Sequence, residues 1–456
     1  MHDVVVVGGG NAGLVAAISA REAGASVLLL ERAPRWQRGG NSRHTRDIRY
    51  AHAPGEPYTT GEAYPTEELL QDLLSVGGRT ASQTMAELVI EESQTVAEWM
   101  SQHGVRWQQP LTGTLHLGRT NRFFLGGGKA LVNTYYQMAE RLGIEIHYEA
   151  AVTDVTLQDG VATGVVLGDR PIEGRAVVLT SGGFEANIEW LKRYWGDAAD
   201  NYVVRGTPHN DGRVLSAMLD KGACTAGDPK GFHAVAVDAR APKFDGGIAT
   251  RLDSVPFGIV VNKPGRRFYD EGQDFWPKRY AIWGRLIAEQ PEQIAYSIVD
   301  APKLDRFLTS LYRPYQDSTV GGLAAQLGLD PAAVECAVRE FNDHIVPGGQ
   351  YDAARLDTCR TDGLDPPKSH WAEPIDTPPF YGYALRPGVT FTYLGLAVDE
   401  YARVRTKQGT LTNVYAAGEI MSGNVLSSGY LGGFGLTIGT VFGRMAGGEA
   451  AKHAAN

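Results

Sequence analysis

The sequence contains few cysteines, and none of them is placed to hold a metal cluster. Three cysteines occur in 456 residues, at positions 224, 336 and 359, and there is no Cys-x-x-Cys pair. A disulfide framework, a zinc knuckle and an internal iron–sulfur cluster are therefore not expected, and we predict no metal site.

Long apolar runs and clustered positive charge are also missing. No run of about 18 apolar residues occurs, so we expect no membrane-spanning helix. The formal net charge is −9 without a visible basic stripe, so nucleic-acid binding is not expected. The apolar stretch near residue 1 lacks the basic leading region of a signal peptide, so we expect a strand there and a cytoplasmic protein.

Glycine, with 56 residues, is abundant, and its first cluster belongs to a complete βαβ pattern. Residues 3–7 form an apolar strand, and Gly-x-Gly-x-x-Gly follows within 8–13. A helix is predicted over 14–23 and a second strand over 26–30, which leads directly to Glu31. This order of elements is typical of a dinucleotide-binding unit, and a glycine-rich turn without a ligand is the alternative.

Each glycine of the motif has a separate physical task in such a unit. Gly8 permits a tight turn, Gly10 lets the backbone approach a pyrophosphate, and Gly13 lets helix and strand pack closely. The phosphates would lie at the positive end of the helix. Glu31 lies 18 residues after Gly13, about the spacing at which an acidic residue binds a ribose hydroxyl.

The chain is too long for one core, and its middle differs from its ends. The ends alternate strands with helices, including a strand over 414–417 and a helix over 435–453 whose small residues suit close packing on the first βαβ unit. From about 229 to 384 the sequence is richer in Pro, Trp and Arg, and this alternation is lost. We therefore predict an α/β protein in which residues 1–228 and 385–456 form one domain and residues 229–384 form an inserted one.

Several segments outside the βαβ unit carry a resemblance to a known family. Together with that unit, segments 39–42, 180–184, 415–419 and 432–433 resemble the flavoproteins of the fumarate reductase/succinate dehydrogenase family over nearly the whole chain. The resemblance implies a Rossmann-like FAD-binding domain built from both chain ends, with an α+β capping domain inserted between them. It also implies that the substrate exchanges a hydride with flavin N5 in the cleft between the domains.

Within this family, the longer segments 274–284, 386–396 and 418–426 resemble FAD-dependent tricarballylate dehydrogenases. That resemblance implies formation of a C=C bond in a small polycarboxylate, tricarballylate to cis-aconitate, by α-proton abstraction and hydride transfer to the flavin. It also implies a separate, membrane-linked iron–sulfur protein as electron acceptor, because three scattered cysteines cannot build a cluster.

Three alternatives to this activity remain open. One is fumarate-reductase-like reduction of an unsaturated dicarboxylate. Another is dehydrogenation of a bulkier keto substrate, as in 3-ketosteroid dehydrogenases, which Tyr430, Phe391 and Tyr393 suggest. The third is a flavin-binding electron-transfer or assembly subunit without a substrate of its own.

The resemblance assigns roles in FAD binding residue by residue. Glu31 would hold the adenosine ribose, and Val152 would meet the adenine through its backbone. Asn41 stands where succinate dehydrogenases carry a flavin-linking histidine, so non-covalent FAD is expected, and His44 nearby is a weak candidate for a covalent anchor. The residues expected to bind FAD are Gly8, Gly10, Asn11, Ala12, Gly13, Glu31, Arg32, Gly40, Asn41, Ser42, Val152, Gly182, Glu419, Gly435 and Leu436.

Four residues are expected to act on the substrate. His233 resembles the family's cap-entry histidine that holds a substrate carboxylate, and Arg251 replaces the glutamate of the family's proton relay, where an extra cation would suit an extra carboxylate. Arg279 is favoured as the proton-transferring arginine, with Lys278 as the alternative. Tyr430 resembles the tyrosine that polarises a carbonyl in 3-ketosteroid dehydrogenases. Further cations available to a carboxylate are His209 and Arg386.

Overall fold

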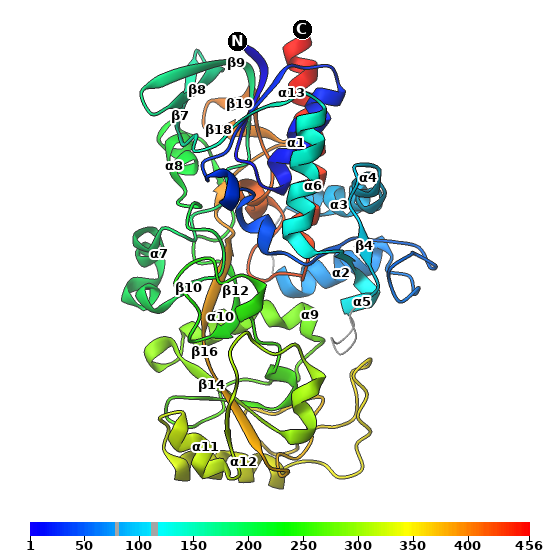
Figure 1. Ribbon diagram of the computed structural model, residues 1–456, viewed down its shortest axis with the longest axis vertical. Coiled ribbons are helices and arrows are strands. Elements are labelled where there is room, and N and C mark those ends of the chain that lie inside the picture. The colour runs from blue at the N-terminus through cyan, green and yellow to red at the C-terminus, as the bar shows by residue number, and fades with distance from the viewer. Residues whose placement is uncertain (78–81, 111–116) are drawn as a thin grey trace.

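An eight-stranded sheet built from both ends of the chain forms the part of the molecule that holds the two termini (Figure 1). The computed structural model describes residues 1–77, 82–110 and 117–456. Five neighbouring strands, in the order β19-β9-β1-β2-β6, are parallel, and β18 pairs antiparallel with β19. The strands are β1 (His2–Val7), β2 (Val27–Leu30), β6 (Glu145–His147), β7 (Val152–Gln158), β8 (Val161–Leu167), β9 (Arg170–Leu179), β18 (Arg403–Thr406) and β19 (Gly409–Ala416).

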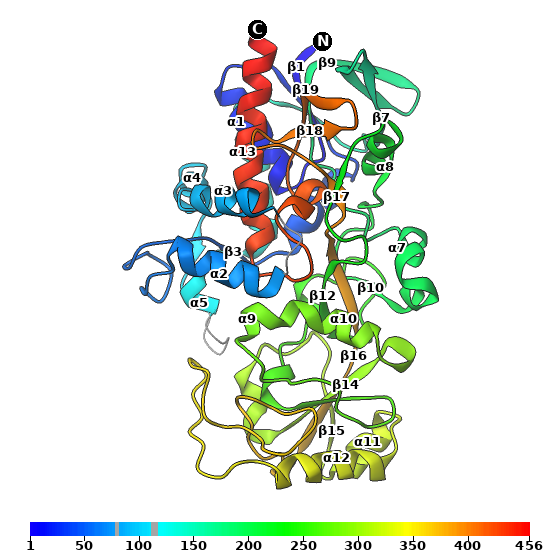
Figure 2. The same cartoon turned by 180° about the vertical axis from the view of Figure 1, so that it is seen from behind.

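The first and last helices pack together on this sheet, as Figure 2 shows most clearly. A Cβ atom on Gly443 of α13 (Phe434–Ala455) would lie 2.7 Å from the carbonyl oxygen of Ala12 in α1 (Asn11–Glu22). One on Gly447 would lie 2.2 Å from the carbonyl oxygen of Ala16. Glycine is therefore required at both positions, which confirms the expected close packing of the last helix on the first βαβ unit.

A six-stranded, mostly antiparallel sheet occupies the opposite part of the molecule (Figure 1). Its long strand β16 pairs with four other strands and runs unbroken across residue 385, where the sequence predicts a domain boundary. The boundary itself stays a prediction. The strands are β10 (Val203–Val204), β12 (Phe232–Asp238), β13 (Ile259–Asn262), β14 (Ala295–Asp300), β15 (Tyr315–Asp317) and β16 (Phe380–Thr392).

A second apolar core lies at the far end of this sheet. Leu323 of α11 (Val320–Gln326) and Phe341 of α12 (Pro331–Asp343) are fully buried in one cluster with Ile259 of β13. The strands of this sheet follow one another without the regular strand–helix alternation of the parallel sheet, which explains the change of pattern in the middle of the sequence.

The remaining elements form smaller groups around the two large sheets. No described helix combines the length and the apolar character needed to cross a membrane. The small sheets contain β3 (Asp47–Arg49), β4 (Trp107–Gln108) and β5 (Asn121–Phe124), and β11 (Thr225–Ala226) with β17 (Gly395–Leu396). The other helices are α2 (Thr66–Gly77), α3 (Gln83–Ser93), α4 (Val96–Gln102), α5 (Leu117–Thr120), α6 (Gly127–Arg141), α7 (Ile188–Trp195), α8 (Arg213–Asp220), α9 (Trp276–Arg279) and α10 (Trp283–Ala288).

Candidate active site

One large cavity is lined by residues from both large sheets. Val7 and Ala417, at the carboxyl ends of β1 and β19, line one part of it. Arg205, just after β10, and Thr390 of β16 line another. The cavity has a volume of about 1450 Å³, including its open mouth. Open α/β sheets bind their ligands at this position, outside the carboxyl ends of parallel strands.

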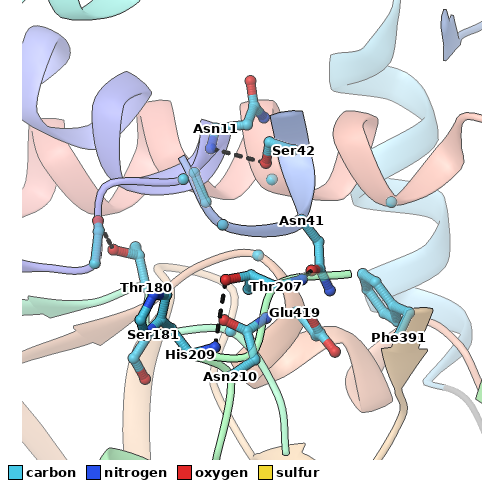
Figure 3. Close-up of a pocket in the computed structure, with 18 of the residues that line it drawn as sticks. Asn11, Asn41, Ser42, Thr180, Ser181, Thr207, His209, Asn210, Phe391 and Glu419 are labelled. Atoms are coloured by element: carbon cyan, nitrogen blue, oxygen red, sulfur yellow. Dashed lines mark hydrogen bonds between the residues drawn. The ribbon is translucent and has the colours of Figure 1, made fainter. Parts of the chain in front are cut away.

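The end of the cavity beside β1 and β2 is formed largely by backbone. Residues 8–12 form the turn into α1, and Glu31 follows β2 directly. The backbone N–H of Asn11 donates to Ser42 Oγ at 3.0 Å, a bond drawn in Figure 3. Because α1 begins at this end of the cavity, its positive dipole favours a phosphate group there.

Gly8 and Gly13 have the roles in turn and packing that the sequence predicts, and the approach of a pyrophosphate to Gly10 stays a prediction. Gly8 has a φ of +107°, and a Cβ on Gly13 would lie 1.9 Å from the Gly8 carbonyl oxygen. Gly10 differs, because the nearest atom to an added Cβ, Ser42 Oγ, lies 3.6 Å away. Gly8 and Gly13 thus permit the turn and its packing, while Gly10 leaves room in the cavity.

Glu31 is fixed in position by backbone donors. Its carboxylate accepts the N–H groups of Gly9 at 3.0 Å and Ala33 at 2.7 Å. Burial raises the pKa of Glu31 above the usual value of a glutamate. The hydroxyl of Tyr136 also donates to Glu31 Oε2 at 3.4 Å. A carboxylate accepts about four hydrogen bonds, so the protein's own donors take up most of its capacity.

Asn41 ties three segments together at the centre of the cavity. Its Nδ2 donates to Glu185 Oε1 and to the Thr390 carbonyl, both at 2.6 Å. Its Oδ1 accepts the backbone N–H of Thr207 at 2.8 Å, and Figure 3 shows these two residues facing each other. The amide is therefore fully engaged within the protein.

Glu185 of this network is fully buried, and the partly buried Glu419 lies close to it. Glu185 Oε1 also accepts Asn210 Nδ2 at 2.7 Å, but Glu185 Oε2 has no hydrogen-bond partner among the described residues. Burial, followed by the charge of Glu185, raises the pKa of Glu419 well above its usual value, and burial raises the pKa of Glu185. The pair therefore keeps a proton to higher pH than exposed carboxyls do. Sequence reasoning did not identify Glu185.

Three aromatic side chains form a cluster at the far end of the cavity. The His233 ring stacks on Tyr430 with centroids 4.0 Å apart, and it meets Tyr280 edge-on at 5.4 Å. Burial, followed by the charges of Arg205 and Arg251, lowers the pKa of His233 well below its usual value, so its imidazole is neutral. The Tyr430 hydroxyl accepts the N–H of Gly435 at 2.9 Å and can donate its own proton to a ligand.

Arg251 lines the same end, but its charge is already compensated. Its Nε and Nη2 lie 2.8 Å and 2.5 Å from Asp253 Oδ1, which also accepts the indole N–H of Trp276 at 2.5 Å. The guanidinium lies 3.9 Å from the centre of the Tyr280 ring. Arg251 thus acts mainly on Asp253 and Tyr280.

Sequence reasoning missed two arginines in this part of the cavity, Arg46 and Arg205. Arg205 Nε donates to Thr390 Oγ1 at 3.0 Å, whereas its Nη1 has no partner in the described part of the chain. Burial lowers the pKa of Arg205 to about 10, and the charge of Arg251 adds to this effect. Arg46 Nη2 likewise lacks a hydrogen-bond partner within the described residues. Neither arginine belongs to a motif, so the sequence offers no local signal for them.

Most residues that the resemblance assigned to FAD and substrate line this cavity. Of the FAD set, only Gly13 is absent from the described lining residues, because it packs against the turn. Of the substrate set, His233, Arg251 and Tyr430 line it, and His209 does too.

Three predicted cations are placed elsewhere. Arg279 is not among the described lining residues, although its neighbour Tyr280 is. Lys278 forms an ion pair with Asp72 at 2.6 Å. Arg386 donates to backbone carbonyls shortly before β14, including that of Gln293 at 3.1 Å. The proton-transfer role of Arg279 thus stays a prediction, and the described lining of the cavity does not support it.

Comparisons with known proteins agree with this architecture. The sequence model of the FAD binding domain family matches residues 3–436. A probable fumarate reductase of Shewanella frigidimarina is 27% identical over 467 residues, covering 99% of this chain and 75% of the relative. An open flavocytochrome c3 fumarate reductase superposes with a TM-score of 0.76 at 23% identity, covering 99% of this chain and 78% of that one. A 3-ketosteroid-Δ4-(5α)-dehydrogenase from Rhodococcus jostii gives 0.74 at 21% identity, with 99% and 96% covered.

Proposed function

This chain belongs to the FAD binding domain family and is an FAD-dependent oxidoreductase, and from this premise we propose that it dehydrogenates a small polycarboxylate. The observation that carries the proposal is Arg205, a buried cation without an ion-pair partner among the described residues, which lines the cavity together with Arg46 and Arg251. Burying unpaired carboxylates is costly, so a polycarboxylate needs such cations. Tricarballylate, giving cis-aconitate, is the specific substrate that the sequence segments favour.

The residues of the other end fit FAD. The turn after β1 offers backbone N–H groups, Gly10 leaves space, and Asn11 Oδ1 is a buried acceptor without a partner among the described residues. Glu31 is held where a ribose hydroxyl would donate to it. FAD, when bound, supplies the acceptor for the hydride that leaves the substrate's β-carbon.

The chain's own groups handle the substrate's charges and its α-proton. Tyr280 is the proton-transfer residue in this proposal, because it lines the cavity beside His233 and Arg251. Arg279 is not among the described lining residues. To take up the α-proton, Tyr280 must react as the phenolate. Burial raises the pKa of Tyr280 and disfavours this form, whereas the charges of Arg251 and Arg205 stabilise it. The Tyr430 hydroxyl would stabilise negative charge on an enolate-like oxygen.

We further propose that FAD is held without a covalent bond. Asn41 is fully hydrogen-bonded, and His44 Nε2 is engaged by Asp245. Acid precipitation should therefore release the yellow colour into the supernatant, and flavin retained in the pellet would refute this.

A separate protein is proposed to take the electrons from the reduced cofactor. The three cysteines are scattered, and the described residues contain no group of His, Cys, Asp or Glu that could hold a metal ion. One structure of similar fold is a flavocytochrome c3 fumarate reductase, and its name indicates a flavin together with a cytochrome. Rapid turnover of the purified chain with oxygen or NAD alone would make such a partner unnecessary. The iron–sulfur nature of the partner and the cytoplasmic location stay predictions.

A second candidate activity is dehydrogenation of a keto substrate. Tyr430 keeps a proton to donate to a carbonyl, and its ring lies 5.8 Å from that of Phe391, which also lines the cavity. The fold shared with a 3-ketosteroid dehydrogenase is compatible with this candidate.

Turnover with an artificial electron acceptor tests the proposal. The holoenzyme should reduce a dye in the presence of tricarballylate and form cis-aconitate, identified by mass spectrometry. Dye reduction with a 3-keto steroid, but with no carboxylic acid, would transfer support to the second candidate. Dye oxidation coupled to fumarate would support reduction as the natural direction.

A further inference from the structure

The charges at the far end of the cavity do not balance. Three arginines line it, and the carboxylates in contact with them are Asp47 and Asp253. Asp253 pairs with Arg251, and Asp47 Oδ2 lies 3.3 Å from Arg46 Nε. Arg205 forms no ion pair with any residue that the structure describes. One positive charge is therefore left without a counterion.

Arg205 is also held in place rather than free to reach solvent. Its backbone N–H donates to Val389 at 2.9 Å, and its Nε donates to Thr390 Oγ1 at 3.0 Å, both on β16. The residue is 6% exposed, and its Nη1 is buried without a partner among residues 1–77, 82–110 and 117–456. A buried, oriented and uncompensated guanidinium destabilises the ligand-free protein unless an anion joins it.

Arg46 supplies a second donor to the same space. Its Nη2 is buried, lies 3.8 Å from Asp253 Oδ2, and makes no hydrogen bond to a described residue. Arg46 and Arg251 share Asp253 as a partner, and both line the cavity together with Arg205.

We propose that Arg205 Nη1 and Arg46 Nη2 form a carboxylate-binding subsite beside the Arg251–Asp253 pair. The proposal rests on the proposed function and deepens it, because it assigns substrate anchoring to two arginines outside every recognised motif. Arg251, already neutralised, then orients Tyr280 instead of holding the extra carboxylate predicted from sequence. The subsite fits one carboxylate, which matches the single surplus charge.

Binding of malonate to the holoenzyme tests the subsite without any turnover. Malonate has two carboxylates and no CH–CH bond, so it cannot be dehydrogenated. The Kd, from isothermal titration calorimetry, should rise about 10- to 150-fold in Arg205→Gln. It should rise less in Arg205→Lys, which keeps the charge but cannot bind a carboxylate with two parallel N–H donors. Arg386→Gln removes a cation of β16 that is not among the described lining residues, so it should leave the Kd unchanged.

Thermal unfolding of the same holoenzymes gives a second readout. Without malonate, Arg205→Gln should melt above the wild type, because the uncompensated charge is gone, and malonate should raise the melting temperature of the wild type only. An Arg205→Gln protein that binds malonate like the wild type, or that is less stable or fails to fold, overturns the subsite. If the wild type itself binds no carboxylate, the proposed function fails together with the subsite.

Discussion

The two ends of the cavity are built in different ways. The end beside β1 and β2 consists of a glycine turn, a helix N-terminus and one backbone-held carboxylate, Glu31. The far end consists of arginine, histidine and tyrosine side chains such as Arg205, His233 and Tyr280, which come from separate elements. The first end carries its geometry within a short stretch of chain, whereas the second exists only after both sheets have assembled.

The largest expected effect concerns Tyr280, the side chain that we propose to move the proton at the far end. Tyr280→Phe removes the hydroxyl beside His233 and should lower kcat by about 10²- to 10⁴-fold. The matched change Arg279→Gln should leave kcat of the saturated enzyme within about threefold, because Tyr280 is a described lining residue of the cavity and Arg279 is not. Stopped-flow bleaching of the flavin by tricarballylate measures both. A wild-type rate for Tyr280→Phe, or a loss of 100-fold or more for Arg279→Gln, would return the role to Arg279.

A smaller effect separates two glycines at the cofactor end. Gly13→Ala places a methyl group 1.9 Å from the Gly8 carbonyl oxygen and should destabilise the fold by roughly 1–3 kcal/mol or more. Gly10→Ala meets nothing closer than 3.6 Å, so the apoprotein should keep its stability while the added methyl group weakens FAD binding. Denaturant unfolding of the apoproteins and fluorescence titration with FAD distinguish the two. Equal losses of apoprotein stability would show that the turn does not separate packing from binding.

The smallest effect concerns the carboxyl pair between the two ends. Because the pKa values of Glu185 and Glu419 are raised, the folded protein binds more protons than the unfolded chain above pH 4.5, the ordinary glutamate value. Stability should therefore fall as the pH rises through the raised pKa values, by on the order of 1 kcal/mol per unit of pKa difference. Glu185→Gln, whose amide can donate to Glu419, should flatten this fall.

Melting temperatures of the holoenzyme between pH 5 and pH 8 measure this pH dependence of stability. The matched change at an exposed carboxyl, Glu400→Gln, should follow the wild type. If Glu185→Gln also follows the wild type, the two carboxyls titrate as ordinary groups.

The cofactor end was predictable because its signals are local. The apolar strand, the spacing of Gly8, Gly10 and Gly13, and the acidic residue after the second strand are all contained in residues 2–31. A side chain at Gly8 or Gly13 would obstruct the backbone of the turn, so a glycine in the sequence is itself evidence for the close packing. The glycines of α13 were predictable for the same reason.

The substrate end was only partly predictable, since its residues meet through tertiary structure. His233, Arg251 and Tyr430 were found by resemblance, whereas Arg46 and Arg205 lie in loops without a motif. A count along the sequence could not decide which of residues 278, 279 and 280 faces the cavity, because α9 is a single short turn. An arginine at position 251 predicts an extra carboxylate site, and local sequence does not show that the side chain pairs with Asp253 in the folded protein.

Anaerobic titration of the oxidised holoenzyme tests most directly whether the far end is a polycarboxylate site. Tricarballylate should bleach the flavin absorbance at low concentration, succinate should bleach it more weakly because it offers one carboxylate fewer, and a 3-keto steroid should leave it unchanged. Bleaching by the 3-keto steroid, with no response to either acid, would contradict the account.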